Sequence, residues 1–298
     1  MPSVAKISVP PIPEPALDSD TLRDLLLEYR ERNWRGIQTP EVRQRVVEET
    51  LRDDGANVLR QVEAFWKLPV AARVLDIGSG VGTFVAACRS RGLQAVGIEP
   101  DRIGQGAPIT SIQIARRRFK TAVFAAAVGE SLPFADACFD LVTMNQVLEH
   151  VTDQMAVVQE AFRVLKPGGA MYIACPNYLR FYESHYKLFW LPLLPKRVGR
   201  WYLRLRGRNP ILLGQITYTT NRRVRRLLAA LASNSQVVDI HREQFLRKLS
   251  HGSFASLKSR VVAKVARLPV VGRLVIHLVL LFLRLREGGC EMLVLRTA

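Results

Sequence analysis

The feature that most restricts the fold of this chain is a regular alternation of short apolar runs with helical stretches, which begins near residue 73. The apolar runs cover residues 74–77, 95–98, 122–127, 139–144 and 170–175, and helical patterns over 82–91 and 153–165 lie between some of them. Strands that alternate with helices form a parallel sheet with helices on both faces. Two later runs, 236–241 and 291–296, would complete one edge. The sequence therefore predicts an α/β fold with a doubly wound, mostly parallel, seven-stranded sheet.

The segments outside this alternation predict further units. Residues 1–17 contain five prolines and no apolar run behind a charge cluster, so we expect a disordered tail rather than a secretory signal. Helical patterns over 21–35 and 40–66, the second opened by Thr39 and Pro40, predict a helical cap over 18–68. The remaining predicted boundaries are a core at 69–178, an insertion at 179–235 that would form a lid, edge strands at 236–244 and 290–298, and a helical insertion at 245–289.

Composition narrows the class of protein. Apolar residues make up 48% of the 298 residues, which is enough to bury a full core and excludes a disordered chain. Cys88, Cys138, Cys175 and Cys290 lie far apart without a C-x-x-C pair, so neither a metal site nor a disulfide is predicted. The most apolar stretch, 268–285, is interrupted by charged residues, whereas a membrane span needs about 20 apolar residues. We expect a cytoplasmic protein, and the sequence leaves its oligomeric state open.

A glycine-rich turn follows the first predicted strand and reads VLDIGSGVGT over residues 74–83. In an open parallel sheet, ligands bind at this end of the strands. The dinucleotide-binding fingerprint has a third glycine where this chain has Thr83. A carboxylate at Asp76 would also repel a pyrophosphate. S-adenosylmethionine carries an ammonium and a sulfonium and no phosphate, so the turn favours this cofactor over NAD.

The second predicted strand ends at Glu99, about 20 positions past the glycine turn. A carboxylate at this spacing can accept hydrogen bonds from both hydroxyls of a ribose. We therefore predict that Glu99 binds the ribose of the cofactor.

Four strings, in this order and spacing, closely resemble the class I S-adenosylmethionine-dependent methyltransferases: VLDIGSGVGTF, VGIEPD, ESLPFADACFDLVTMNQVLEHV and RVLKPGGAMYIACPN. The resemblance is to the broad group that includes the ubiquinone and menaquinone biosynthesis methyltransferases, and it covers about residues 70–178. It implies a Rossmann-like methyltransferase fold and S-adenosyl-L-methionine as the cofactor.

The resemblance also implies which residues contact the cofactor. They are Asp76, Gly78 and Gly80 for the methionine half, Glu99 for the ribose, Pro100 for the adenine, and Asn145 and Gln146 for the methyl end. Many relatives have an adenine-binding Asp at the position of Val128. This departure removes one hydrogen bond, worth about 0.5–1.5 kcal/mol, unless the backbone of Gly129 replaces it.

Methyl transfer from a sulfonium is an in-line displacement, and it needs a base only where the acceptor is a weak nucleophile such as a hydroxyl. His185, flanked by Tyr186 at the start of the first insertion, is the strongest candidate for a base or an acceptor contact. A helix whose aromatic residues pack on the domain would explain the same residues. His150, in the string LEHV, is a further candidate for which a structural role is an alternative. His185, Tyr186 and His150 are thus the predicted catalytic residues.

The excess of positive charge lies in the second half of the chain. Of 43 Lys and Arg and 26 Asp and Glu, residues 176–298 hold 23 and 5, and the formal net charge of the chain is +17. Both insertions place Lys and Arg beside Leu, Val and Trp, a pattern typical of helices that lie in an anionic bilayer interface. A core-covering segment with a solvated charged face is the structural alternative. We predict a small, lipid-linked or glycan acceptor at a membrane surface, with the protein peripheral on the inner face.

Two other functions fit the same sequence. A basic half could bind the phosphate backbone of RNA, which makes an RNA methyltransferase the first alternative. Against it, the apolar residues are mostly Leu and Val, which suit acyl chains better than a nucleic-acid groove. The string Met144-Asn145-Gln146-Val147 also departs from the N-P-P-Y pattern of enzymes that methylate amino groups of nucleic acids. The second alternative is a non-catalytic S-adenosylmethionine-binding protein, because a fold does not fix a function.

Overall fold

A computed structural model describes residues 17–53, 55–100, 110–119, 124–251, 278 and 289–297. Within this part of the chain the main sheet has seven strands. From one edge to the other they are β3 (Phe124–Ala126), β2 (Gln94–Glu99), β1 (Arg73–Ile77), β4 (Phe139–Asn145), β5 (Leu165–Pro176), β9 (Gly289–Arg296) and β8 (Ser235–Asp239). The first five are parallel, and β9 runs antiparallel between β5 and β8. The predicted seven-stranded, mostly parallel sheet is confirmed.

Helices cover both faces of the sheet, as the alternation of strands and helices predicts. One face packs against α6 (Gln154–Val164) and α9 (Asn221–Ala229). The other packs against α3 (Ala56–Glu63), α4 (Thr83–Ser90), α5 (Ser111–Phe119) and the start of α10 (Ile240–His251). Apolar residues alternate along the strands between the two cores, so that Val74 faces the second group of helices and Leu75 the first.

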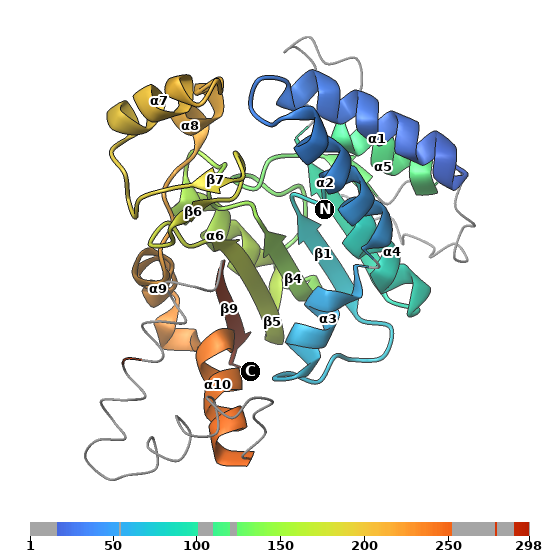
Figure 1. Cartoon of the computed structure of the whole chain (residues 1–298). Coiled ribbons are helices and arrows are strands. Elements are labelled where there is room, and N and C mark those ends of the chain that lie inside the picture. The colour runs from blue at the N-terminus through green and yellow to red at the C-terminus, as the bar shows by residue number, and fades with distance from the viewer. Residues whose placement is uncertain are drawn as a thin grey trace.

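A helical cap lies at the carboxyl end of the sheet, beside the end of β1 (Figure 1). It consists of α1 (Ser19–Trp34), capped by the side chain of Asp18, and α2 (Pro40–Arg52), capped by Thr39. The two helices pack on each other and on α5 through Leu22, Leu26, Val47 and Ile114. The cap is thereby fixed beside the turn between β1 and α4.

The predicted continuous helix over 40–66 is wrong, because the chain breaks between α2 and α3. Gly55 has a φ of +67°, a left-handed conformation that ends regular helix. A Cβ at this position would lie 2.5 Å from the carbonyl oxygen of Thr83, so Gly55 also lets the chain pass close to α4. Only α1 and α2 belong to the cap, and α3 covers the sheet.

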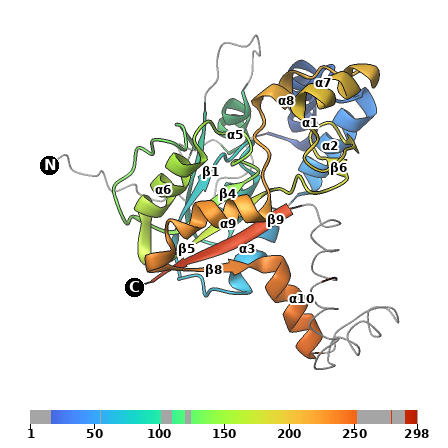
Figure 2. The same ribbon diagram turned by 90° about the vertical axis from the view of Figure 1, so that its left-hand side faces the viewer.

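The lid comprises β6 (Tyr182–Glu183), β7 (Leu188–Phe189), α7 (Lys196–Leu205) and α8 (Ile211–Gln215). Its own core contains Tyr186, Trp190, Leu203 and Leu213, and Ile37 of the cap packs into the same core. Figures 1 and 2 show the cap and the lid gathered at one end of the sheet. The predicted lid of 179–235 is too long, since Val224 and Leu228 of α9 are buried against the sheet.

The last part of the chain departs from the predicted boundaries. Strand β8 ends at Asp239 and α10 begins at Ile240, so the strand predicted over 236–244 is shorter and His241 lies in a helix. Most of the predicted insertion 245–289, and the predicted tail except Leu17, lie outside the described residues. Among the helices that are described, none combines the length and the apolarity needed to cross a bilayer.

Candidate functional site

The turn between β1 and α4 brings the backbone close to the next loop. Gly78 has a φ of +72°, and a Cβ added there would lie 2.5 Å from Cγ2 of Val147. The N–H groups of Gly78 and Ser79 both donate to the carbonyl oxygen of Ile98, each at 2.9 Å. A side chain at residue 78 would therefore displace either the turn or the segment that follows β4.

Asp76 lies under this turn, and only 5% of the residue is exposed. Its Oδ1 accepts a hydrogen bond of 2.7 Å from the hydroxyl of Thr143, the neighbouring residue on β4. Burial raises the pKa of Asp76 to about 7, and the nearby charge of Glu99 acts in the same direction. A cation placed beside Asp76 would stabilise its ionised form.

Glu99, the last residue of β2, is anchored to the turn by two hydrogen bonds. Its Oε2 accepts from the N–H of Gly80 at 3.1 Å, and its Oε1 accepts from the hydroxyl of Ser111 at 3.0 Å. Each carboxylate oxygen has a second lone pair. The two bonds fix the carboxylate at the end of β2, where it is an acceptor suited to a diol such as a ribose.

Three cavities of about 310, 280 and 250 Å³ surround the turn. Their lining contains most of the predicted cofactor-binding residues. Asp76, Gly78 and Asn145 line the first, Gly78, Pro100, Val128 and Gly129 the second, and Gly80 and Glu99 the third. Tyr29 and Arg30 of the cap complete the third. A close-approach glycine, a fixed acceptor carboxylate and a buried carboxyl thus fit the ribose and the amino group of S-adenosylmethionine.

Two predicted cofactor residues have less enclosed positions. Val128 is 47% exposed and lines the second cavity. Gln146 has a φ of +60° and an exposed side chain, and its N–H donates to the carbonyl oxygen of Ala174 at 2.7 Å. Gln146 lines none of these three cavities, although Asn145 beside it does.

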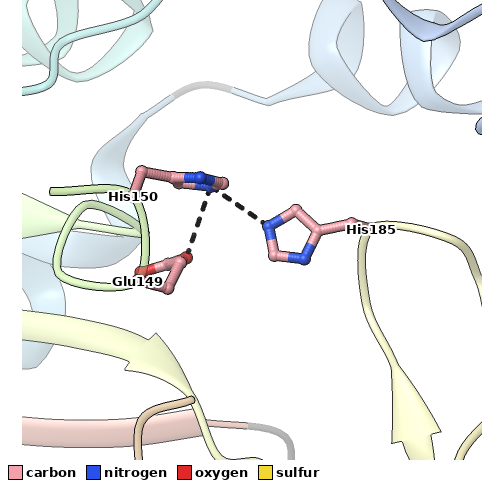
Figure 3. Close-up of side chains that lie close together, drawn as sticks. All are labelled: Glu149, His150 and His185. Atoms are coloured by element: carbon pink, nitrogen blue, oxygen red, sulfur yellow. Dashed lines mark hydrogen bonds and ion pairs between the residues drawn. The ribbon is translucent and has the colours of Figure 1, made fainter. Parts of the chain in front are cut away.

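The two predicted catalytic histidines meet at the same end of the sheet. Nε2 of His185, in the turn between β6 and β7, lies 3.1 Å from Nε2 of His150, which follows β4 (Figure 3). Nδ1 of His185 is 2.8 Å from Oε1 of Glu183. The ring of Trp34 in the cap stacks parallel to that of His185, with centroids 6.4 Å apart. Cap, lid and sheet therefore all contribute to the surroundings of His185.

Tyr186 does not join this pair. The residue is fully buried in the core of the lid, its hydroxyl donates to the carbonyl oxygen of Asn209 at 2.9 Å, and it accepts from the N–H of Leu213 at 3.2 Å. Its position matches the alternative in which aromatic residues of the insertion serve packing. Tyr186 therefore stabilises the lid.

Two buried carboxyl groups that the sequence did not predict as site residues lie next to the histidines. Glu149 and Glu183 are both 0% exposed. Burial raises the pKa of Glu149 to about 7. Glu183 accepts from the N–H of Tyr186 at 2.6 Å and from the hydroxyl of Tyr178 at 3.2 Å. The sequence did contain one indication of their role. Each lies within two residues of a histidine that was predicted to be catalytic.

Comparisons with known proteins identify the family. Residues 45–240 match a family model described as a methyltransferase domain. A 143-residue match to an uncharacterized methyltransferase of Mycobacterium sp. (strain KMS) is 34% identical and covers 48% of this chain and 54% of that protein. A 117-residue match to one of Mycobacterium leprae (strain TN) is also 34% identical and covers 39% and 42%. The chain spans about half the length of the curated relatives it matches.

A solved structure shares the fold. It is phosphoethanolamine N-methyltransferase 2 of Haemonchus contortus in complex with phosphomonomethylethanolamine and S-adenosylhomocysteine, with a TM-score of 0.51 and 15% identity, over 94% of this chain and 61% of that one. The sheet order and the glycine turn define the class as that of Rossmann-like methyltransferases. The chain belongs to the methyltransferase domain family, as a class I S-adenosylmethionine-dependent member.

Proposed function

We propose that this protein transfers a methyl group from S-adenosylmethionine to a small, lipid-linked acceptor at an anionic membrane surface. The observation that carries the proposal is the outer surface of the lid. It combines exposed apolar and basic side chains, and the same lid carries His185 on its inner side. The acceptor would enter between the lid and the sheet.

The residues around the glycine turn would hold the cofactor. When bound there, S-adenosylmethionine supplies a methyl group already activated on a sulfonium. Asp76 would pair with its amino group, Glu99 would accept hydrogen bonds from the ribose, and Pro100, Val128 and Gly129 would flank the adenine. Asn145 and Gln146, at the end of β4, would lie towards the reacting centre. These residues contribute by alignment and by excluding water, which together can supply about 7–11 kcal/mol.

His185 and His150 would face the acceptor. Glu183 accepts the Nδ1 hydrogen of His185, which leaves the Nε2 lone pair directed at His150. A polar cluster beside the cofactor cavities suits an acceptor with an oxygen nucleophile, because a hydroxyl must lose its proton when it is methylated. Residues 144–147 also lack the N-P-P-Y pattern of enzymes that methylate exocyclic amines. This absence likewise argues against an exocyclic amine as the methyl acceptor.

Helix α7 carries three parallel stripes of side chains. They are a buried stripe of Gly199 and Leu203, an exposed apolar stripe of Val198, Trp201 and Leu205, and an exposed basic stripe of Arg197, Arg200 and Arg204. The apolar stripe is 48%, 61% and 64% exposed. A helix of ten residues with this pattern can lie in a bilayer interface, with its apolar stripe among the acyl chains and its arginines at anionic headgroups.

The rest of the lid extends this surface. Eight of the eleven exposed large apolar residues found in the described part of the chain fall between 181 and 211. Phe181 and Phe189 of the hairpin stack with ring centroids 6.0 Å apart and are 49% and 58% exposed. Large exposed apolar surface marks interaction sites in soluble proteins. The arginines beside it favour an anionic bilayer as the partner.

Vesicle co-sedimentation tests the membrane part of the proposal. We expect the full chain to sediment with phosphatidylcholine vesicles that contain phosphatidylglycerol and to stay in solution with pure phosphatidylcholine. The double variant Trp201→Ser, Leu205→Ser should bind about tenfold or more weakly, because each buried apolar side chain contributes about 1.5–3 kcal/mol. Val70→Ser is the matched control, since Val70 is 99% exposed but lies outside the lid.

The reaction itself is tested with labelled S-adenosylmethionine and a bacterial lipid extract. Label in the organic phase that depends on Asp76 supports the proposal. Label in RNA, together with tRNA binding that persists at about 0.2 M salt, would support an RNA methyltransferase instead. Cofactor binding without transfer to any fraction would favour a non-catalytic binding protein.

A further inference from the structure

We propose that Glu149, His150 and His185 bind a divalent transition-metal ion through one carboxylate and two imidazoles. Glu149 and His150 follow β4, and His185 comes from the turn between β6 and β7. The inference rests on the proposed function for the purpose of the ion, which would hold an oxygen of the acceptor. Binding of the ion can be measured without any acceptor.

The three side chains converge. One ligand atom from each lies within 4.8 Å of the other two. Nε2 of His150 is 3.1 Å from Nε2 of His185 and 3.9 Å from Oε1 of Glu149, and the imidazole planes are inclined at 87° (Figure 3). Ligands about 2.1 Å from a tetrahedral zinc ion are about 3.4 Å apart. Small rotations of these side chains would therefore bring all three atoms to one ion.

Glu149 supplies an independent indication that a cation belongs here. Its side chain is 0% exposed, and both carboxylate oxygens lack a hydrogen-bond partner within the described residues. Its carbonyl oxygen accepts from the N–H of Thr217 at 2.8 Å, which fixes the segment that carries it. An ionised carboxylate buried without a hydrogen bond is strongly unfavourable. A metal ion between Glu149 and the two imidazoles would compensate that charge.

The histidine from the lid is already oriented as a metal ligand. Glu183 accepts from Nδ1 of His185 at 2.8 Å, which places the lone pair on Nε2, the atom that faces His150. The second oxygen of Glu183 is held by the N–H of Tyr186 at 2.6 Å. Carboxylate–histidine pairs of this kind fix the tautomer and the ring orientation of histidines that bind metals. Glu183 is thus a positioning residue.

The donor set selects the class of ion. One carboxylate and two histidines occur in catalytic zinc sites, which keep an open position for water or substrate, and imidazole suits Zn²⁺ and Fe²⁺ better than Mg²⁺. His150 is 37% exposed at its side chain, whereas His185 is 9% exposed, so the cluster is open on one side. The cysteine spacing predicted no metal site, but none of these ligands is a cysteine.

Titration of the full chain after chelator treatment tests the inference. We expect one equivalent of Zn²⁺ to bind by calorimetry, one equivalent of Co²⁺ to give visible absorption bands, and Mg²⁺ to bind at least a hundredfold more weakly. Glu149→Gln and His185→Gln should each weaken Zn²⁺ binding at least tenfold. Glu183→Gln should weaken it about tenfold to a hundredfold through the orientation of His185.

His241→Gln is the matched control, because His241 lies in α10 outside the cluster and its replacement should leave Zn²⁺ binding unchanged. The thermal shift caused by S-adenosylhomocysteine reports whether each variant is folded. Absence of Zn²⁺ binding to the wild-type chain, or binding by Glu149→Gln and His185→Gln as tight as that of the wild type, would overturn the inference. If the cofactor analogue still binds in that case, the metal site fails while the proposed methyl transfer stands. If Zn²⁺ binds but no methyl group is transferred, the metal site stands and the proposed methyl transfer fails.

Discussion

Cγ2 of Val147 occupies the position beside Gly78 that a side chain at residue 78 would need, at 2.5 Å from an added Cβ. This contact couples the glycine turn after β1 to the loop after β4. The first lines the cavities assigned to the cofactor, and the second leads through Leu148 to Glu149 and His150. The two halves of the site are thus in direct contact at residues 78 and 147.

Gly78→Ala should abolish the thermal shift caused by S-adenosylhomocysteine. The alanine meets both a left-handed φ, which costs about 1–2 kcal/mol, and the side chain of Val147. Gly92→Ala is the control, because Gly92 has a φ of +76° and nothing within 4 Å of an added Cβ. The control should lose similar backbone stability and keep the ligand shift. Equal ligand shifts in both variants would contradict the role given to this close approach.

Asp76 should make cofactor binding depend on pH. Because its pKa is raised to about 7 and an adjacent ammonium favours the ionised form, affinity for S-adenosylhomocysteine should fall about tenfold per pH unit below 7 and level off above it. Calorimetry between pH 5.5 and 8.5 measures this slope. Asp76→Asn should bind weakly and without the slope, and a slope that persists in this variant would assign it to another group.

A rise in pH that strengthens cofactor binding through Asp76 should lower the contribution of the same carboxyl to the stability of the cofactor-free protein. Its pKa is higher in the folded chain than its ordinary value of 3.8, so the folded state binds the proton more tightly. The contribution of Asp76 to stability is therefore fully present below about pH 4 and is lost as pH rises to about 7. Asp76→Asn should be at least as stable as the wild type at pH 8 by thermal unfolding without ligand. A lower melting temperature there would contradict the assigned burial penalty.

Glu99→Gln should weaken S-adenosylhomocysteine binding about tenfold to a hundredfold. Hydrogen bonds to a charged group contribute about 1.5–3 kcal/mol, and an amide offers one acceptor oxygen in place of two. Ser111→Ala removes a hydrogen bond to Glu99 but leaves the carboxylate, and should cost less affinity. Isothermal titration of both variants provides the comparison. A larger loss in Ser111→Ala would argue against direct ribose binding by Glu99.

Two leucines of α7 separate packing from surface function in the lid. Leu203 is 0% exposed and Leu205 is 64% exposed. Leu203→Ala should lower the free energy of unfolding by about 2–5 kcal/mol, whereas Leu205→Ala should change it by less than about 0.5 kcal/mol. Chemical denaturation measures both values. Similar losses in the two variants would mean that Leu205 packs against the protein in solution.

The strands and the position of the glycine turn were predictable because they depend on local periodicity. Runs of buried residues fixed the five parallel strands, and the carboxyl ends of neighbouring parallel strands meet at one edge of a sheet. Asp76, Gly78 and Glu99 could therefore be placed together from the sequence. The break at Gly55 was missed, because the contact that requires this glycine is with Thr83, far along the chain.

The sequence by itself determined the class of the fold, the end of the sheet at which the site lies and the residues next to the glycine turn. Only the tertiary structure decided that His150 and His185 face each other, that Glu149 and Glu183 lie beside them, and that Tyr186 is buried away from them. The physical reason is that these contacts join a strand end to a turn of the lid. Packing among the lid, the cap and the sheet brings the strand end and the turn together. The periodicity of the sequence does not predict this packing.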